Sequence, residues 1–199
     1  MLSRYYASHS VNIVAMLKRS FQEMGIPPGY GVKQLLYSPA ASVLVAQIQS
    51  GVKNWRPERL FWRHIQSDKY NSIGQPDDLI SQDSPFVHPS KPLLAYACME
   101  HRFLLDTKGE EVHGADWDSL KIYNLETATE VESVNKETLT LPPGMVTGWI
   151  FNLVSFGDSG LFVQAGLSGN GSRIDYVIAE LDLFSRILKP VVTLPATFI

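Results

Sequence analysis

Three histidines in the middle of the chain, with several carboxylates near them, are the residues best suited to chemistry. They are His88, His101 and His113. Imidazole and carboxylate groups together bind divalent metals, and a bound metal would support a lyase or hydrolase reaction. However, the histidines are thirteen and twelve residues apart, which matches no compact ligand motif. The sequence therefore favours solvated or locally bonded histidines, with a divalent metal as the alternative and no other cofactor indicated.

A second motif with chemical potential is Gly157-Asp158-Ser159-Gly160, which is similar to the nucleophile segment of trypsin-like serine proteases. That chemistry also needs a histidine and an aspartate within reach of the serine. The glycine that usually follows the motif is Leu161 here, and the Ala-Ala-His-Cys context of the protease histidine is absent. Because Asp and Gly suit the backbone of a tight turn, we predict a turn and no catalytic residue.

Aromatic and charged residues in two predicted loops are the better candidates for a ligand surface. Residues 109–118 are acidic and contain glycine, which predicts an exposed loop. The tryptophans could equally fill gaps in a core. The predicted surface residues are Trp55, Arg56, Asp116, Trp117 and Asp118.

The chain after Tyr30 contains a loose internal repeat. Windows 38–47, 88–97 and 155–164 align without gaps, each with small and polar residues followed by an apolar run. Leucine occupies the seventh position of each window, and a short apolar stretch precedes each one. Every unit is therefore predicted to begin with a strand, a tight turn and a second strand.

The later part of each unit is also predicted to repeat. Segment 120–131 aligns with 174–187 so that Leu125 matches Leu181 and Val131 matches Ile187, and 60–65 is a weaker counterpart. Thr-Leu-Pro at 140–142 recurs at 193–195 and is predicted to mark a unit boundary. Units of about 40–50 residues with four strands are typical of propeller blades.

These segments resemble TolB-like and WD-like β-propeller repeats. Residues 88–96 are similar to the family's turn that begins Ser-Pro-Asp-Gly, although the first unit lacks the Asp-Gly pair. Residues 123–131 are similar to the closing hairpin of such blades, with Asn124 where Asp is common and Ala128 where the pattern has Gly. The resemblance covers about residues 31–195. It implies the fold and a platform for binding, with lyase or hydrolase activity in some members.

We therefore predict an all-β protein with three four-stranded blades, with a β-sandwich or irregular barrel as the alternative. The predicted blades are residues 31–82, 83–142 and 143–199, after an N-terminal helical segment in residues 1–30. A helix is expected over 10–24, because Ile13, Leu17 and Phe21 share one face with two methionines. Gly25 and the two following prolines end it.

Composition narrows the possible partners and compartment. The chain has 199 residues and a formal net charge of −3, without the basic surplus of a nucleic-acid binder. No apolar run reaches the roughly 18–20 residues of a membrane span, and no convincing signal peptide is present, so a cytoplasmic protein is expected. The single cysteine, Cys98, lies in an apolar strand and is expected to be buried and inert.

Three blades cannot close a ring, because propellers have about 4–8 blades. A homodimer with six blades would solve this, and two-fold dimers are the commonest oligomers. The alternatives are a helix that caps one exposed face, or a longer propeller of which this is a part. The predicted function is a non-enzymatic scaffold that binds a protein or small ligand, and the alternative is a metal-assisted enzyme.

Overall fold

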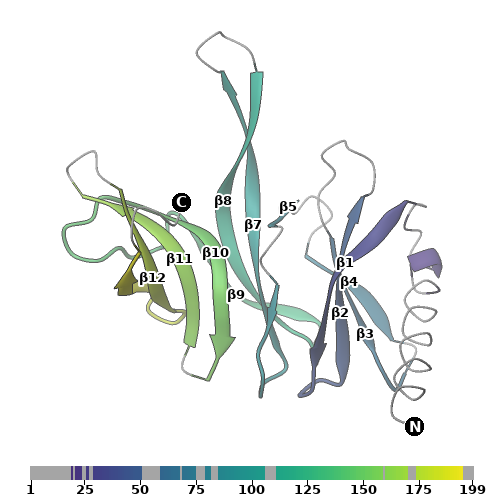
Figure 1. Cartoon of the computed structure of the whole chain (residues 1–199). Coiled ribbons are helices and arrows are strands. Elements are labelled where there is room, and N and C mark those ends of the chain that lie inside the picture. Colours follow the sequence, from purple (N-terminus) through teal and green to yellow (C-terminus); the bar gives the residue numbers. More distant parts are fainter. Residues whose placement is uncertain are drawn as a thin grey trace.

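The computed structural model is an all-β fold of three antiparallel sheets with a short helical segment at the N-terminal side (Figure 1). The sheets stand side by side in a row and do not close into a barrel. The structure describes residues 19, 21–23, 26, 29–50, 59–67, 69–74, 79–81, 85–105, 111–158, 160–169 and 174–194. The predicted all-β class with three blade-like sheets is confirmed.

Each sheet is built from one continuous stretch of the chain, and in the first and third sheets the strands that are neighbours in the sheet are also neighbours in the chain. The first sheet contains β1 (Tyr30–Ser38), β2 (Val43–Ser50), β3 (Arg59–His64) and β4 (Tyr70–Ile73). The second contains β5 (Leu79–Ile80), β6 (Phe86–Val87), β7 (Leu93–Leu105), β8 (Glu111–Asn124) and β9 (Thr129–Asn135). The third contains β10 (Thr147–Gly157), β11 (Gly160–Ser168), β12 (Ile174–Asp182) and β13 (Ile187–Thr193).

The second sheet is four strands wide, because two short strands share one edge of β7. Leu79 of β5 pairs with Met99, and Phe86 of β6 pairs with Ala95 further along the same strand. β5 thus belongs to the second sheet although it precedes residue 83, where the sequence placed the start of the second blade.

The first hairpin of each sheet falls where the repeat predicted it. Ser38 pairs with Val43, and the His88 amide donates to the Leu93 carbonyl, so both turns contain four residues. In the third sheet Gly157 pairs with Gly160 across only two residues. The gap-free alignment of the three windows is therefore correct for the strands that follow the turns. Before the turn it is wrong by two residues in the third window, because Gly157, and not Ser155, corresponds to His88.

The predicted match between Leu125 and Leu181 is wrong by two residues. Asn124 Oδ1 accepts hydrogen bonds from the amides of residues 126 and 127, at 2.9 and 3.1 Å. Asp182 Oδ1 accepts them from residues 184 and 185, at 3.0 and 3.1 Å. Asn124 thus corresponds to Asp182, and Leu125 to Leu183. Because side chains alternate with a period of two along a strand, a two-residue shift preserves the apolar pattern and is invisible in it.

The two repeats of Thr-Leu-Pro have different surroundings. Thr140 follows β9 and forms a parallel bridge with Ile187 on the free edge of β13. Its amide donates to the Arg186 carbonyl at 2.8 Å, and its carbonyl accepts from Leu188 at 3.0 Å. Thr193 is the last residue of β13 and pairs with Val177. The segment after β9 therefore crosses the outer edge of the third sheet before entering β10.

Two apolar clusters fill the spaces between the sheets. One contains Val45, Leu60 and Trp62 of the first sheet with Leu94 and Tyr96 of the second. The other, larger cluster joins further residues of the second sheet, including Ala95, Ala97, Trp117, Leu120 and Ile122, to Leu161, Val163, Ala165, Ala179 and Leu181 of the third. Cys98 is buried, as predicted.

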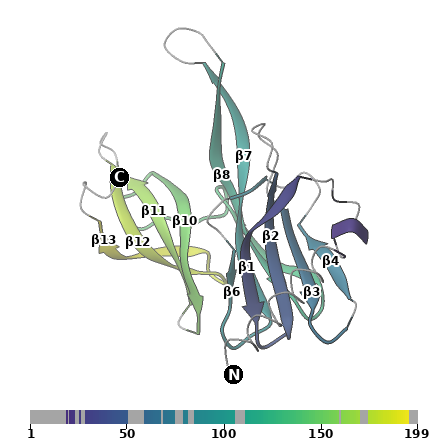
Figure 2. The same cartoon turned by 45° about the vertical axis from the view of Figure 1, so that its right-hand side comes forward.

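The N-terminal helical segment packs against its own chain. Residues 19 and 21–23 are helical, and the other residues of the predicted helix lie outside the described part. The rings of Phe21 and Phe61 are 5.9 Å apart, and Ile26 joins the same cluster on the first sheet. This contact is on the side of the sheet that faces away from the rest of the row (Figure 2). No helix in the described residues is long and apolar enough to cross a membrane.

Candidate functional site

His88 lies at the end of the molecule where turns of the second and third sheets meet. Its side chain is 1% exposed. Its Nδ1 accepts hydrogen bonds from the amides of Ser90 and Lys91, at 3.2 and 3.1 Å. The ring thus accepts hydrogen bonds from the amides of the β6–β7 turn, as the side chains of Asn124 and Asp182 do in later turns. A locally bonded histidine, which the sequence favoured, is what the structure contains.

The third sheet contributes Phe156, near the end of β10, and Asp158, in the turn that follows. Asp158 Oδ1 accepts a hydrogen bond of 2.7 Å from Ser90 Oγ and lies 3.6 Å from His88 Nε2. The ring of Phe156 meets the imidazole edge-on, with 4.9 Å between the centroids. The contacts of His88 and Ser90 with Phe156 and Asp158 therefore link the second sheet to the third.

The environment of His88 disfavours protonation of the imidazole. Burial, and then the positive charge of Lys91, lower the pKa of His88 below its ordinary value of 6.5. The carboxylate of Asp158 and a hydrogen bond to the Gly157 backbone act in the opposite direction but do not prevail. Since Nδ1 accepts two amide hydrogens, the ring proton resides on Nε2.

A cleft of about 340 Å³ opens beside this cluster. His88 and Lys91 line one side, and the third sheet contributes Asp158, Glu180 and Phe184. Gly160 has a φ of 132°, and a Cβ there would lie 3.0 Å from Glu180 Oε1. A glycine therefore suits both the left-handed backbone of this turn and the position of the Glu180 carboxylate.

The cluster contains serine, histidine and aspartate but not in an arrangement that activates a nucleophile. Ser90 Oγ donates to Asp158, and it lies 3.5 Å from a His88 nitrogen that already accepts two amide hydrogens. A general base must offer a free acceptor to the hydroxyl. Because Gly157 pairs with Gly160, the Gly-Asp-Ser-Gly segment is the hairpin turn that the sequence predicted. The arrangement supports a structural link between sheets.

The three histidines proposed as metal ligands do not come together. His101 pairs with Ala115 and His113 with Phe103 in the β7–β8 ribbon. Leu94, the partner of Val87, lies seven residues before His101 on β7, which corresponds to roughly 23 Å at the rise of a strand. A shared site for all three is therefore wrong. Within the described ranges, no group of three or more histidine, cysteine or acidic residues is placed to hold a metal ion.

The five residues predicted to form a ligand surface do not form one described patch. Trp55 and Arg56 lie outside the described residues. Asp116, Trp117 and Asp118 belong to strand β8 and not to an exposed loop, so that part of the prediction is wrong. Trp117 is 1% exposed in the core between the second and third sheets.

A β-bulge explains this arrangement. Cys98 pairs with Ser119 but Met99 pairs with Trp117, which leaves Asp118 between them without an opposite residue. A bulge changes the direction of the side chains around it. Trp117 is thereby buried while Asp118 remains exposed and accepts a hydrogen bond from Ser119 Oγ.

Sequence reasoning missed Asp158 as the partner of His88 because the two belong to different repeats. The only available signal was that His88 stands at a turn position occupied by serine in the first window.

No known protein family and no curated protein matches this chain. The resemblance to propeller repeats therefore remains a prediction from the motifs.

Proposed function

We propose that the protein is a non-enzymatic β-propeller-type scaffold whose three sheets are completed by a second copy. The resulting six-bladed ring would bind a protein or a small ligand. The arrangement of the sheets supports this reading, because each sheet packs face to face on the next, as blades do, and the row does not close on itself.

Exposed apolar residues at the two ends of the row carry the proposal. At one end, Val32, Leu35 and Tyr37 of β1 are 43%, 41% and 51% exposed. At the other end, Val154 of β10 and Val192 of β13 are 41% and 53% exposed. In a two-fold dimer the first sheet of each chain would face the third sheet of the other. Burying these side chains favours association.

The His88 cluster supports a binding role over catalysis. Its groups already bond one another, and the pairing of β7 with β8 places His101 and His113 away from His88 along the ribbon. A cytoplasmic location stays a prediction from the sequence.

The mass of the protein in solution, measured by light scattering over a dilution series, tests the pairing. We expect wild-type protein to pass from single chains to dimers as its concentration rises. Tyr37→Glu should weaken this association roughly a hundredfold, because it would bury an unpaired charge in the contact. Val131→Glu is the matched control, since Val131 is 50% exposed but lies on β9 of the middle sheet.

Dimers that are lost in Tyr37→Glu and retained in Val131→Glu would support the proposal. Wild-type protein that stays a single chain at every concentration would overturn it. Dimers that Tyr37→Glu leaves unchanged would also overturn it, because the ends of the row would then not be the contact.

A further inference from the structure

We infer that the cleft shared by the second and third sheets binds an arginine side chain of a partner protein. Two carboxylates, of Asp158 and Glu180, and the ring of Phe184 would hold the guanidinium group. This inference rests on the proposed binding role and names its ligand, but it does not require the pairing of two copies.

The charged groups that line the cleft are mostly acidic. The third sheet contributes the carboxylates of Asp158, Glu180 and Asp182, and Lys91 is the one cation among the described lining residues. The His88 imidazole adds little positive charge, because burial lowers its pKa. A cleft with an excess of one sign of charge attracts a ligand of the opposite sign. The lining therefore favours a cationic ligand over an anionic one.

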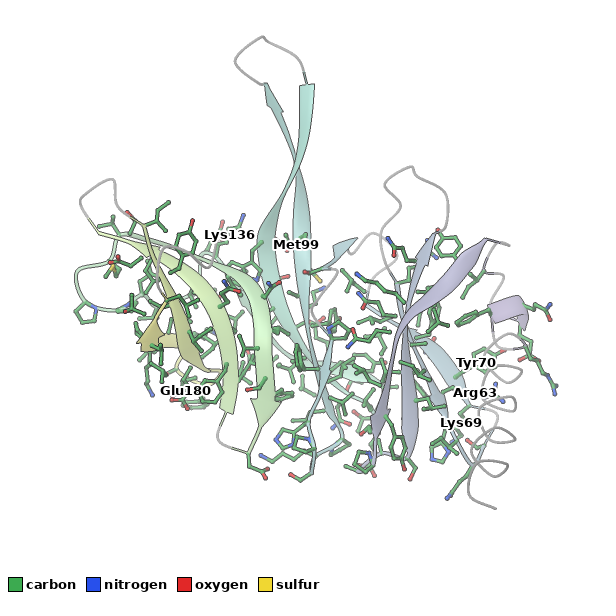
Figure 3. The ribbon with its side chains drawn as sticks, viewed as in Figure 1. Arg63, Lys69, Tyr70, Met99, Lys136 and Glu180 are labelled. Carbon is green, nitrogen blue, oxygen red and sulfur yellow. The ribbon has the colours of Figure 1, made fainter. Side chains whose placement is uncertain are left out.

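Glu180 is the carboxylate best placed to hold a cation. Its side chain passes over Gly160, where an added Cβ would lie 3.0 Å from Glu180 Oε1. Figure 3 shows Glu180 near the end of the third sheet at which the β10–β11 turn lies. Lys189 is opposite Glu180 on β13, but its Nζ lies 3.6 Å from Asp182 Oδ2. Within the described residues Glu180 has no ion pair of its own, so its charge is available to a ligand.

Asp158 offers a second carboxylate at the same end of the sheet. It lies in the two-residue turn between β10 and β11, and its side chain is 71% exposed. Its contacts with Ser90 Oγ and His88 Nε2 both involve Oδ1. A guanidinium group carries several N–H donors in a planar fork and can bond to more than one carboxylate oxygen. Arginine therefore matches the pair of Asp158 and Glu180 better than the single ammonium group of lysine.

Phe184 indicates that the arginine belongs to a protein. The residue lines the cleft from the β12–β13 turn, and it is 99% exposed. Aromatic residues and arginine are enriched where proteins meet, and a guanidinium over an aromatic face gains cation–π attraction. The volume of the cleft, about 340 Å³, is near the lower limit of pockets for drug-sized ligands. A single side chain, with the partner's surface over Phe184, therefore fits the site.

An NMR titration of the isotope-labelled full chain tests the inference. The probe is the peptide Gly-Gly-Arg-Gly-Gly, acetylated at one end and amidated at the other. We expect saturable shifts of the Asp158 and Gly160 amide signals with a Kd of about 1 mM. The same peptide with citrulline, which has nearly the shape of arginine but no charge, should bind at least about tenfold more weakly.

Variants of the lining should change the Kd in opposite directions. Glu180→Gln should weaken binding about tenfold, because it removes a charge-assisted hydrogen bond. Phe184→Ala should weaken it about threefold through the loss of the cation–π contact. Lys91→Gln should strengthen it about twofold, because a repulsive charge is removed. The amide spectrum of each variant shows directly whether the fold is kept.

Glu137→Gln is the matched control for Glu180→Gln. Glu137 is exposed and follows β9, and Figure 3 shows its neighbour Lys136 toward the opposite end of the third sheet from Glu180. The substitution removes the same charge from the protein but should leave the Kd unchanged.

The outcomes separate the cleft from the pairing of copies. Shifts that Glu180→Gln weakens and Glu137→Gln preserves would support the inference. Absence of shifts in the wild type, equal binding of the citrulline peptide, or equal effects of the two glutamine variants would overturn it. Dimers in light scattering without peptide binding would overturn the cleft and leave the proposed pairing standing. Cleft-dependent binding by a protein that stays a single chain would support the cleft and overturn the pairing.

Discussion

The imidazole of His88 stands edge-on against the ring of Phe156, with 4.9 Å between their centroids and an interplanar angle of 85°. One residue belongs to a turn of the second sheet and the other to the third. Together with the hydrogen bond from Ser90 to Asp158, this contact connects the second and third sheets at the end of the molecule where their turns meet.

Removal of the His88 ring should destabilise the fold. We expect His88→Ala to lower the free energy of unfolding by about 2–3 kcal/mol, because two turn amides lose their acceptor and a cavity opens beside Phe156. His88→Asn should cost less, since Asn124 accepts the same pair of amide hydrogens in its own turn. Urea unfolding followed by fluorescence measures both changes.

His64→Ala provides the control for this comparison. Among the residues that the structure describes, His64 Nδ1 accepts one amide hydrogen bond, from Gln66 at 3.1 Å, and the residue is half-buried. Its removal should cost no more than about 1 kcal/mol. Equal losses at positions 64 and 88 would contradict the linking role of His88.

The lowered pKa of His88 predicts a loss of stability in mild acid. The unfolded chain takes up a proton near the ordinary value of 6.5, whereas the folded protein does so only at lower pH. Stability should therefore fall as the pH decreases from about 6.5 to the lowered pKa of the folded state, and this contribution should then level off. Above pH 6.5 His88 contributes no pH dependence.

Urea midpoints of wild type and His88→Asn, compared at several pH values, measure this effect. The difference between the two proteins isolates His88 from the carboxyl groups, among which Asp182 has a lowered pKa and titrates in a more acidic range. Parallel curves through pH 6.5 would contradict the prediction.

Ala128 occupies a backbone conformation that favours glycine. Its φ is 57°, in the left-handed region, at the position where the resembling repeats have glycine. Ala128→Gly should raise the free energy of unfolding by about 0.5 kcal/mol, because the relief of strain exceeds the added freedom of the unfolded chain. Thermal unfolding measures the change.

Ala41→Gly is the matched control for Ala128→Gly. Ala41 lies in the β1–β2 turn without a positive φ and is half-buried. The same substitution there should lower stability by about 0.5–1 kcal/mol. A loss of similar size at both positions would show that residue 128 carries no strain.

Cys98 should be unreactive toward a thiol reagent in the folded protein. Its side chain is 3% exposed within the core between the first and second sheets, so modification requires unfolding. A colorimetric assay should count no thiol in native buffer and one in guanidinium chloride. Phe184→Cys is the positive control, because Phe184 is 99% exposed; rapid labelling of wild type would contradict the described burial.

The sequence predicted the class and the first hairpin of each sheet because apolar runs and turn residues are local signals. Registers across repeats were less predictable. The match of Leu125 to Leu181 failed because an even shift keeps every side chain on its face. Matching Asn124 to Asp182 would have given the correct register. The Asn124 amide oxygen and the Asp182 carboxylate each accept a hydrogen bond from the backbone amide two residues further along the chain.

The candidate site was predictable only in part. A local role for His88 followed from its position in a turn, but its partner Asp158 is seventy residues away along the chain. Trp117 was misplaced because its acidic neighbours resemble a loop, and the bulge that buries it depends on the pairing of β7 with β8. Such long-range pairing leaves no signal in a single sequence.

The consecutive order of strands in each sheet has a consequence for biosynthesis. Every strand within a sheet pairs with a near neighbour in the chain, so a sheet can form as soon as its last strand leaves the ribosome. Such local pairings close small loops and form quickly. The bridge from Thr140 to Ile187 is different, because the segment after β9 must wait for β13. Vectorial folding should therefore order the first two sheets early and fix the outer edge of the third sheet last.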